Sequence, residues 1–239
     1  ASLGVEIAWI KEARTLRLHA AEISSTIAPY DQVRKMRASF NVLGPLLARV
    51  GHATVSLPGG CAIGARPVDL HLKAFEAMGA DIHIEQGYVK AAALRGLKGA
   101  EIEFPFVSVG ATEHAMLAAV LAKGDTVLSN AAQEPEIADL AECLNAMGAR
   151  VEGAGTSEIR ISGVASLMGA RHAVVADRIE TGTYALAAAA TPGSDVLLQG
   201  GRFEHLAALL KFLRATGISI EAEARGLRVI RGQKTQLAP

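Results

Sequence analysis

A cysteine in a glycine-rich segment is the feature of this sequence best suited to chemistry. Cys61 lies in the stretch Ser56–His71 (SLPGGCAIGARPVDLH), and Arg66 follows it by five residues. A nearby guanidinium favours the thiolate, so it lowers the pKa of a thiol from its usual value of about 8.5. Glycines let a ligand approach the backbone, and Asp69 is placed to cap a helix whose N-terminus attracts anions. The segment predicts a site for a small phosphorylated or carboxylated ligand, and a surface loop with an incidental cysteine is the alternative.

Two further segments have the residue types of an anion site. Arg37 belongs to a basic cluster, Val33–Ser39 (VRKMRAS), at the start of a predicted helix, where a solvated helix end is the alternative. Val107–Thr112 (VSVGAT) has the composition of a strand-to-helix turn, whose backbone N–H groups can hold a phosphate. Many turns in α/β proteins share this composition, so an ordinary turn also fits the second segment.

Composition excludes several classes of protein. The chain has 239 residues, of which 50% are hydrophobic, and its 24 basic residues balance 24 acidic ones. Such a chain can bury a sizeable core, and its lack of net charge provides no electrostatic footprint for nucleic acid or an anionic membrane. No apolar stretch approaches the ~20 residues that cross a bilayer. The seven histidines lack metal-ligand spacing, the two cysteines form no C-x-x-C, and no G-x-G-x-x-G occurs. We therefore expect a globular protein of a reducing compartment, with neither a metal nor a dinucleotide.

An internal repeat of about seventy residues organises the chain. Glycine followed by alternating residues recurs in LGVEIAW, MGADIHI, MGARVEG and TGISIEA, at spacings of 69 to 75 residues. Glycine in this context is typical of the left-handed residue that ends a helix, and the alternation indicates a strand. Further strands recur in phase at Ala53–Leu57, Asp125–Ser129 and Ser194–Leu198. The repeat predicts an α/β (α+β) fold, and a solenoid is the alternative.

Each repeat is predicted to run helix, strand, helix, strand, strand. The predicted buried helices are 37–50, 111–123 and 181–191, and the predicted outer helices are 69–78, 136–147 and 204–216. Cys143 lies beside apolar residues of one outer helix and is expected to be structural. Gly4 occupies the position that closes the second helix of a unit, and the first half of that unit does not precede it. We therefore expect the chain to be a fragment.

Five motifs together resemble a known family. KMRASF, PGGCAIGARPVDLH, SVGAT, NAAQEPEI and DRIETGT, in this order, are similar to the UDP-N-acetylglucosamine 1-carboxyvinyltransferase family of enolpyruvyl transferases. The resemblance runs from about Tyr30 to the end of the chain, and the loop around Cys61 is its most specific part. It implies domains that are inside-out α/β barrels of three repeat units each, with helices inside and sheets outside. Residues 1–176 would then form a first domain that lacks its opening half-unit, and residues 177–239 the first unit of a second domain.

The resemblance also implies an activity and a site. The family transfers the enolpyruvyl group of phosphoenolpyruvate to the 3-hydroxyl of UDP-N-acetylglucosamine, releasing phosphate, in the first committed step of peptidoglycan precursor synthesis in the cytoplasm. That step supports cell wall biogenesis and cell division, and the family needs no metal or organic cofactor. Cys61 matches the proton donor to the enolpyruvyl methylene, which is also the target of fosfomycin, and Arg66 matches a catalytic arginine that contacts both substrates. The positions that match sugar-nucleotide contacts are Arg37, Arg66, Pro67, Val68, Asp69, Leu70, Ser108, Val109 and Gly110.

The sequence departs from the family at several positions. Phe106 stands where some members have a lysine, and Asn41 replaces a tryptophan found in some members. A Lys-Asn pair, an aspartate base for the sugar hydroxyl and later phosphate-binding arginines have no counterpart here, so we expect the 239-residue chain alone to be inactive. Two alternatives stay open: a sibling of the same fold, such as a shikimate-type carboxyvinyltransferase or an RNA 3′-terminal phosphate cyclase, and a non-catalytic binding module built from repeats.

Overall fold

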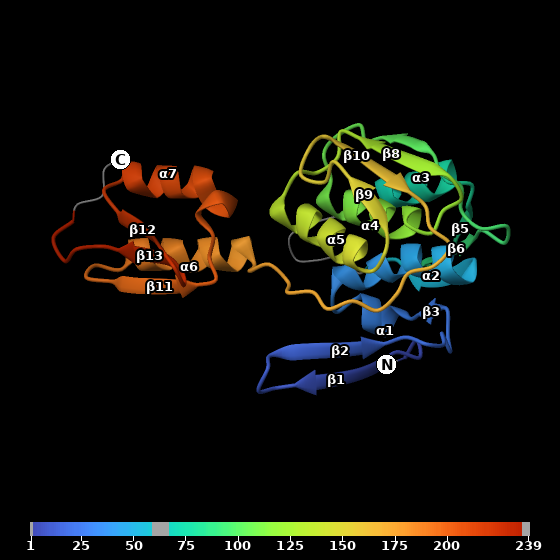
Figure 1. The fold of residues 1–239 in the computed structure, drawn as a ribbon, viewed down its shortest axis with the longest axis horizontal. Helices are drawn as coiled ribbons and strands as arrows, with labels where there is room; N and C mark the ends of the chain where they lie inside the picture. The colour runs from blue at the N-terminus through green and yellow to red at the C-terminus, as the bar shows by residue number, and fades with distance from the viewer. Residues whose placement is uncertain (1, 59–66, 236–239) are drawn as a thin grey trace. The chain divides into compact units, whose positions relative to one another are not determined.

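The structure is a computed structural model that describes residues 2–58 and 67–235. Cys61 and Arg66 therefore lie outside the described residues. Helices and strands alternate along the chain, which confirms the predicted α/β class (Figure 1). Within the described ranges, no helix is both long enough and apolar enough to cross a membrane.

The predicted order of elements recurs three times. The first repeat contains α2 (Leu43–Val50), β4 (His52–Ser56), α3 (Asp69–Ala77), β5 (Asp81–Glu85) and β6 (Tyr88–Ala92). The second contains α4 (Val109–Ala119), β8 (Asp125–Ser129), α5 (Pro135–Ala146), β9 (Arg150–Glu152) and β10 (Glu158–Ser162). The third contains α6 (Arg178–Ala190), β11 (Asp195–Gln199), α7 (Ala207–Ala215), β12 (Ser219–Glu223) and β13 (Gly226–Ile230). Before them come β1 (Glu6–Ile10), β2 (Thr15–His19) and α1 (Tyr30–Val33), and two helices begin with 3₁₀ turns, η1 (Arg37–Val42) and η2 (Phe203–Leu206).

The repeated glycines adopt the left-handed conformation that the sequence predicts. The φ angles of Gly4, Gly79, Gly148 and Gly217 are +94°, +87°, +94° and +90°. The last three follow α3, α5 and α7, and each donates its N–H to the carbonyl three residues earlier. Left-handed backbone is strained for any residue with a Cβ, so glycine lets helix and strand join without a longer loop.

Each repeat contributes one sheet. The orders are β3-β4-β6-β5, β7-β8-β10-β9 and β11-β13-β12, and β1 pairs with β2 in a hairpin. Two strands were not predicted, β3 (Ile27–Ala28) and β7 (Glu101–Glu103), which run parallel to β4 and β8 respectively. They are two and three residues long, too short to show the alternation by which a strand is recognised.

The chain divides into two compact units, Ala1–Gln133 with Leu140–Arg171 and Glu134–Asp139 with His172–Pro239. The predicted domain boundary after residue 176 lies five residues beyond Arg171. The assignment of these parts to a first and a second family domain stays a prediction.

Helix α4 forms the centre of the first unit. It packs against both α2 and α3. Its buried residues are Ala111, Thr112, His114, Ala115, Met116, Ala118 and Ala119. The four alanines let neighbouring helices approach closely, and one face of the surrounding strands is buried against them, as in the pattern eBiBi of β8. This burial confirms the prediction for helix 111–123, although the helix begins at Val109 and ends at Ala119.

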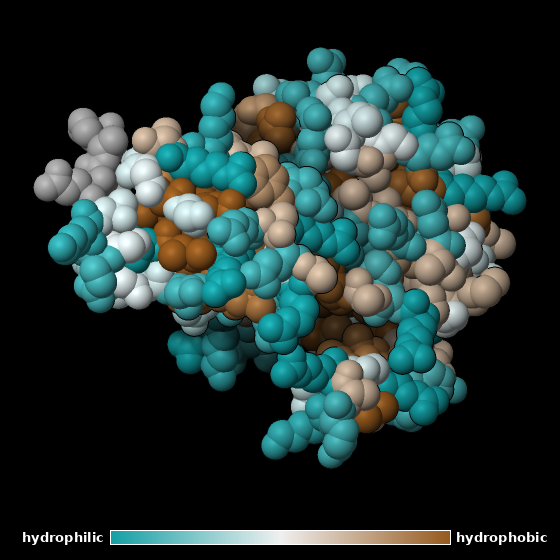
Figure 2. Space-filling model, turned by 60° about the vertical axis from the view of Figure 1, so that its left-hand side comes forward, coloured by the Kyte–Doolittle hydropathy of each residue, from teal (hydrophilic) through white to brown (hydrophobic). Residues whose placement is uncertain are grey.

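Helix α6 of the second unit differs from the prediction that it is buried. Gly182, Ala185, Ala188 and Ala189 face the core of this unit, whereas Ile179 and Tyr184 are 62% and 58% exposed. Within this unit, α6 packs against β11, β13 and the segment η2–α7. In the face of the molecule shown in Figure 2, hydrophobic side chains reach the surface in separate patches among polar ones.

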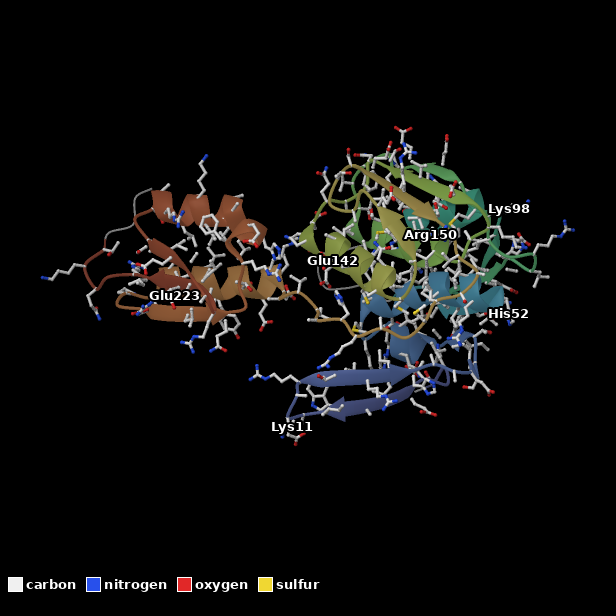
Figure 3. The ribbon with its side chains drawn as sticks, in the orientation of Figure 1. Lys11, His52, Lys98, Glu142, Arg150 and Glu223 are labelled. Carbon is white, nitrogen blue, oxygen red and sulfur yellow. The ribbon has the colours of Figure 1, made fainter. Side chains whose placement is uncertain are left out.

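Charged side chains of both signs are distributed over both units. Examples are the exposed residues Lys11, Lys98, Glu142, Arg150 and Glu223, which extend from the ribbon in Figure 3. This mixture agrees with the zero net charge of the sequence.

Candidate active site

Three segments that are far apart in the sequence meet in the first unit. Arg37 is the first residue of η1, Asp69 is the first residue of α3, and Ser108 precedes the first residue of α4. The Nη2 atom of Arg37 donates a hydrogen bond to the carbonyl oxygen of Pro67 at 3.2 Å. The packing of α3 on α4 brings the N-terminal ends of these helices to the same place. The structure therefore brings together Arg37, the segment after residue 66 and the turn before α4, as the site prediction requires.

The N-terminus of α4 is formed as the sequence predicts. Ser108 is the N-cap, with extended backbone, and its Oγ accepts a hydrogen bond from the backbone N–H of Ala111 at 3.3 Å. The first N–H groups of a helix have no acceptor within the helix, and they carry the positive end of its dipole. The backbone of Val109 and Gly110 therefore offers donors for an anion.

Gly110 lies beside residues of the other two segments. A Cβ placed on Gly110 would lie 3.4 Å from Cε1 and 3.7 Å from Nε2 of His71, and 4.0 Å from Nη1 of Arg37. Space beside this backbone thus borders an imidazole edge, a guanidinium and the start of a helix. All three favour an anion: the imidazole and the helix start offer N–H groups, and the guanidinium carries a positive charge.

A cavity of about 220 Å³ occupies this place. It is lined by Arg37, Ala38, Phe40, Asn41, His71, Gly110 and Glu113. Nδ2 of Asn41 and Oε2 of Glu113 are 3.5 Å apart on its wall. A larger cavity of about 760 Å³ elsewhere in the unit is lined mainly by aliphatic side chains, with Arg49 as its one basic residue besides His19 among those described. The smaller cavity has the denser set of polar groups, and it is the better candidate for a phosphorylated ligand.

Two buried histidines support the wall of this cavity, and sequence reasoning missed them. Nδ1 of His71 lies 2.9 Å from Nδ1 of His114, and the backbone N–H of Gly44 donates to Nε2 of His114 at 2.7 Å. His71 is 4% exposed and His114 is completely buried. The only signal in the sequence was their position among apolar residues on two helices, because their 43-residue separation fits no spacing motif.

Both histidines are neutral near pH 7. Burial, followed by the positive charge of Arg37, lowers the pKa of His71 to about 4, with Asp69 opposing the shift. Burial, followed by His71, lowers the pKa of His114 well below its usual value. In both cases water is unavailable to solvate an imidazolium, so the uncharged ring is favoured.

The four residues after Arg66 divide into two kinds. The side chains of Val68 and Leu70 are buried, at 8% and 6% exposure, so any contact they make with a ligand would come from their backbone. Pro67 and Asp69 are exposed. The expectation that Asp69 caps α3 is wrong: Val68 holds the N-cap position and no side chain caps this helix. Asp69 instead lies in the first turn, where a carboxylate interacts favourably with the helix dipole.

The remaining predicted residues have the following places. Cys61 and Arg66 lie outside the described residues. Phe106, the position at which the family resemblance implies a lysine in some members, is 58% exposed. Cys143 is half-buried rather than fully buried. In the described ranges, no three His, Cys, Asp or Glu side chains gather in a way that could hold a metal ion.

The segment DRIETGT begins α6 in the second unit. Asp177 is the N-cap, and its Oδ1 accepts hydrogen bonds from the N–H groups of Ile179 and Glu180 at 2.7 and 3.1 Å. Arg178 makes a two-point ion pair with Glu136 at 3.0 and 3.1 Å. Burial alone would raise the pKa of Glu136, but the hydrogen bonds and charge of Arg178 outweigh it and lower that pKa. Asp177 therefore caps α6 with its own side chain.

Comparison with known proteins connects this chain to a family of carboxyvinyltransferases. The family model of EPSP synthase (3-phosphoshikimate 1-carboxyvinyltransferase) matches residues 1–238. The UDP-N-acetylglucosamine 1-carboxyvinyltransferase of Hyphomonas neptunium is 66% identical over 222 residues, 93% of this chain and 52% of that protein. The protein of the same name from Maricaulis maris is 65% identical over 230 residues, 96% of this chain and 54% of that protein. The chain therefore spans about half the length of the curated relatives it matches.

Solved structures show the same fold. The enolpyruvyl transferase NikO from Streptomyces tendae matches 100% of this chain with a TM-score of 0.81 at 20% identity, over 57% of its own length. EPSP synthase from Acinetobacter baumannii matches 97% of this chain with a TM-score of 0.70 at 24% identity, over 54% of its own length. At such identities the likeness concerns the fold alone, and it confirms the enolpyruvyl transferase-like fold that the repeats and motifs predict.

Proposed function

This chain belongs to the EPSP synthase family, and we propose that the intact protein transfers the enolpyruvyl group of phosphoenolpyruvate to the 3-hydroxyl of UDP-N-acetylglucosamine, releasing phosphate. The observation that carries the proposal is the meeting of three segments in the first unit: Arg37 donates a hydrogen bond to Pro67, and Arg37, His71 and Gly110 of α4 line one cavity. That arrangement supplies charge and N–H groups for the diphosphate of a sugar nucleotide. The name shared by relatives that are 65–66% identical supports the same substrates.

The proposed reaction proceeds by addition and elimination. The Cys61 thiol gives a proton to C3 of phosphoenolpyruvate while the 3-oxygen of the sugar bonds to C2 and passes its own proton to a base. The base in the family is an aspartate with no counterpart among the matched positions of this chain. The tetrahedral adduct then loses a proton from C3 and expels phosphate, which restores the double bond in the product. An acid that protonates carbon works best with a pKa near the working pH, and a neighbouring arginine such as Arg66 would tune the thiol in that direction.

The described part of the proposed site holds the nucleotide rather than the reacting carbon. We assign the diphosphate to the backbone of Ser108, Val109 and Gly110 together with Arg37, since Arg37 and Gly110 line the cavity and Ser108 and Val109 directly precede Gly110 at the start of α4. We assign the uridine to the backbone of Pro67–Leu70, because two of the four side chains there are buried in the core. Fixing the nucleotide would place the sugar hydroxyl and raise the effective concentration of the acceptor.

Two alternatives are less well supported. A shikimate-type transferase shares the fold, but the solved EPSP synthase is only 24% identical, compared with 66% for the sugar-nucleotide enzyme of Hyphomonas neptunium. A non-catalytic binding module would not need a thiol beside an arginine. The remaining proposals follow from the activity: a cytoplasmic enzyme of peptidoglycan synthesis that supports cell division and is inhibited by fosfomycin, with no metal or organic cofactor.

Labelling of Cys61 tests the proposal against both alternatives. The intact protein is treated with fosfomycin, with and without UDP-N-acetylglucosamine, and the adduct is located by peptide mass spectrometry. We expect Cys61 to be labelled, at a rate that depends on the sugar nucleotide and not on shikimate 3-phosphate, while Cys143 stays unmodified. No adduct under any condition would favour a binding module, and dependence on shikimate 3-phosphate would favour the sibling enzyme.

A further inference from the structure

The backbone of α2 determines which ring nitrogen of His114 carries a proton. Gly44 donates its N–H to Nε2 of His114 at 2.7 Å, so this nitrogen must present a lone pair. A neutral imidazole has one N–H, and it must then lie on Nδ1. A charged ring would direct an N–H at the N–H of Gly44, so the backbone also disfavours the imidazolium.

The same constraint passes from His114 to His71. Their Nδ1 atoms are 2.9 Å apart, within hydrogen-bond distance, and only one of them can supply the proton. Because Nδ1 of His114 is the donor, Nδ1 of His71 is the acceptor and the proton of His71 lies on Nε2. Phe40 meets both rings edge-on at 5.7 and 5.6 Å, and Phe75 meets His114 edge-on at 4.7 Å, so neither ring can turn without displacing an aromatic neighbour.

The Nε2 edge of His71 borders the anion cavity. It lies 3.7 Å from the position that a Cβ on Gly110 would occupy, and Nη1 of Arg37 lies 4.0 Å from the same position. Among the described residues, no hydrogen bond is made by this nitrogen, and His71 is one of the residues that line the cavity. The buried ring thus offers one N–H to whatever occupies the space beside Gly110.

We propose that His114 is a positioning residue, which holds the proton of His71 on Nε2 so that His71 donates a hydrogen bond to a phosphate oxygen of a nucleoside diphosphate. The inference rests on the nucleotide site of the proposed function. It gives a role to His114, which lies in none of the sequence motifs, and to His71, which ends the motif PGGCAIGARPVDLH but received no role from the sequence. His71 would touch the ligand, and His114 would act only through His71. Each group in this series therefore donates a hydrogen bond to the next: Gly44 to His114, His114 to His71, and His71 to the ligand.

His71 would make this hydrogen bond as a neutral group. The charged and titratable side chains that face it are Arg37 from η1, Asp69 from α3, and Glu113 and His114 from α4. Arg37 already supplies positive charge, and it joins burial in lowering the pKa of His71 to about 4. The donor therefore remains available, without a change of charge, at pH values above about 4.

Nitrogen-15 spectroscopy of the imidazole rings tests the inference without any substitution at His114. In the intact protein labelled with ¹⁵N-histidine, a His71→Asn variant identifies the His71 signals. At pH 7 we expect His71 to carry its proton on Nε2 with a bare Nδ1, and we expect the Nε2–H signal to shift when UDP is added. A proton on Nδ1 of His71 would overturn the inference.

Two substitutions of His114 form a matched pair. Asparagine can keep a donor near the position of Nδ1, whereas glutamine can keep an acceptor near the position of Nε2 but loses the donor to His71. We expect His114→Asn to retain the Nε2–H form of His71 and to bind UDP within about threefold of the unsubstituted protein. We expect His114→Gln to mix the two forms of His71 and to weaken UDP binding about tenfold, as for the loss of one hydrogen bond to a charged group.

The outcomes separate this inference from the proposed function. Equal weakening by the two variants, with the His71 signals unchanged, would give His114 a purely structural role and overturn the inference. If His114→Gln does not fold, the spectra of the unsubstituted protein and of His114→Asn still show which nitrogen of His71 carries the proton. Failure of the unsubstituted protein to bind UDP would overturn the nucleotide site and the ligand assigned to His71. The position of the proton on His71 would still show whether His114 orients that ring.

Discussion

Nη2 of Arg37 donates a hydrogen bond to the carbonyl oxygen of Pro67 at 3.2 Å and so joins two segments that are thirty residues apart. Pro67 directly follows the glycine-rich segment that contains Cys61 and Arg66. Arg37 therefore has two tasks: it fixes one end of that segment, and it carries positive charge into the cavity beside Gly110. The four predictions below test this site and the repeat that positions it.

Replacing Arg37 by methionine should weaken nucleotide binding. The variant removes the charge facing the cavity and the hydrogen bond to Pro67, and a hydrogen bond to a charged group contributes about 1.5–3 kcal/mol. We expect the Kd for UDP to rise by about 10- to 100-fold in isothermal titration calorimetry. Arg34→Met is the matched control, because Arg34 is exposed and contacts only Asp31 and Tyr30 among the interactions described for it. An equal loss of affinity in both variants would show that the effect is not local to the cavity.

Gly110→Ala should separate binding from stability. The added methyl would lie at 3.4 Å or more from its nearest neighbours, His71 and Arg37, so the fold can accommodate it. Alanine also has the higher helix propensity, so we expect the free energy of unfolding to be unchanged or raised by up to about 1 kcal/mol. The methyl occupies the space assigned to the ligand, and UDP affinity should fall at least about tenfold.

Gly44→Ala is the contrasting variant, because it should lower stability, whereas Gly110→Ala should lower UDP affinity without loss of stability. A Cβ on Gly44 would lie 2.7 Å from Cδ2 of the buried His114, so this variant should lose stability in urea unfolding. If Gly110→Ala bound UDP with unchanged affinity, the ligand could not lie beside the start of α4.

The buried histidines should make stability depend on pH. His71 has a pKa of about 4 in the folded protein, whereas an unfolded histidine has about 6.5. Between these values the unfolded state binds more protons, so the free energy of unfolding should fall as the pH falls from about 6.5 to about 4. The contribution of His71 alone is about 3 kcal/mol, and it is fully present above pH 6.5.

Urea unfolding at several pH values measures this dependence. His71→Asn should flatten the curve in that range, while His52→Gln, at an exposed side chain labelled in Figure 3, should leave it unchanged. A curve with the same slope in His71→Asn and the unsubstituted protein would contradict the low pKa of His71.

The glycine that ends α3 should be required for its conformation rather than for space. Gly79 has φ +87°, and a Cβ there would meet nothing within 4 Å. Gly79→Ala should therefore cost about 1–2 kcal/mol through backbone strain alone. Gly169 also has open space around a Cβ, but its φ is not positive, so Gly169→Ala should be tolerated. Similar stability of the two variants in thermal unfolding would remove the conformational reason for the repeated glycine.

The sequence was sufficient for the repeat because its signals are local. Left-handed glycine and alternating residues depend only on neighbours in the chain, and Asp125–Ser129 was predicted to the residue. Arg37 and Ser108–Gly110 lie at helix starts, as the local residue pattern predicts, whereas their role in binding stays a prediction.

Long-range relationships could not be predicted in the same way. The contact of His71 with His114 depends on how α3 packs on α4, and no spacing rule connects residues 43 positions apart. The short strand β7 depends on its parallel partner β8, which lies about 24 residues further along the chain.

Product formation by the intact protein tests the central claim most directly. The protein is supplied with phosphoenolpyruvate and UDP-N-acetylglucosamine, without added metal, and released phosphate is measured together with the mass of the sugar nucleotide. We predict one phosphate for each enolpyruvyl group gained by UDP-N-acetylglucosamine, and none when Cys61 is replaced by serine or when shikimate 3-phosphate is the only acceptor. Unchanged UDP-N-acetylglucosamine in the complete mixture, from protein that is folded and binds UDP, would contradict the proposed function.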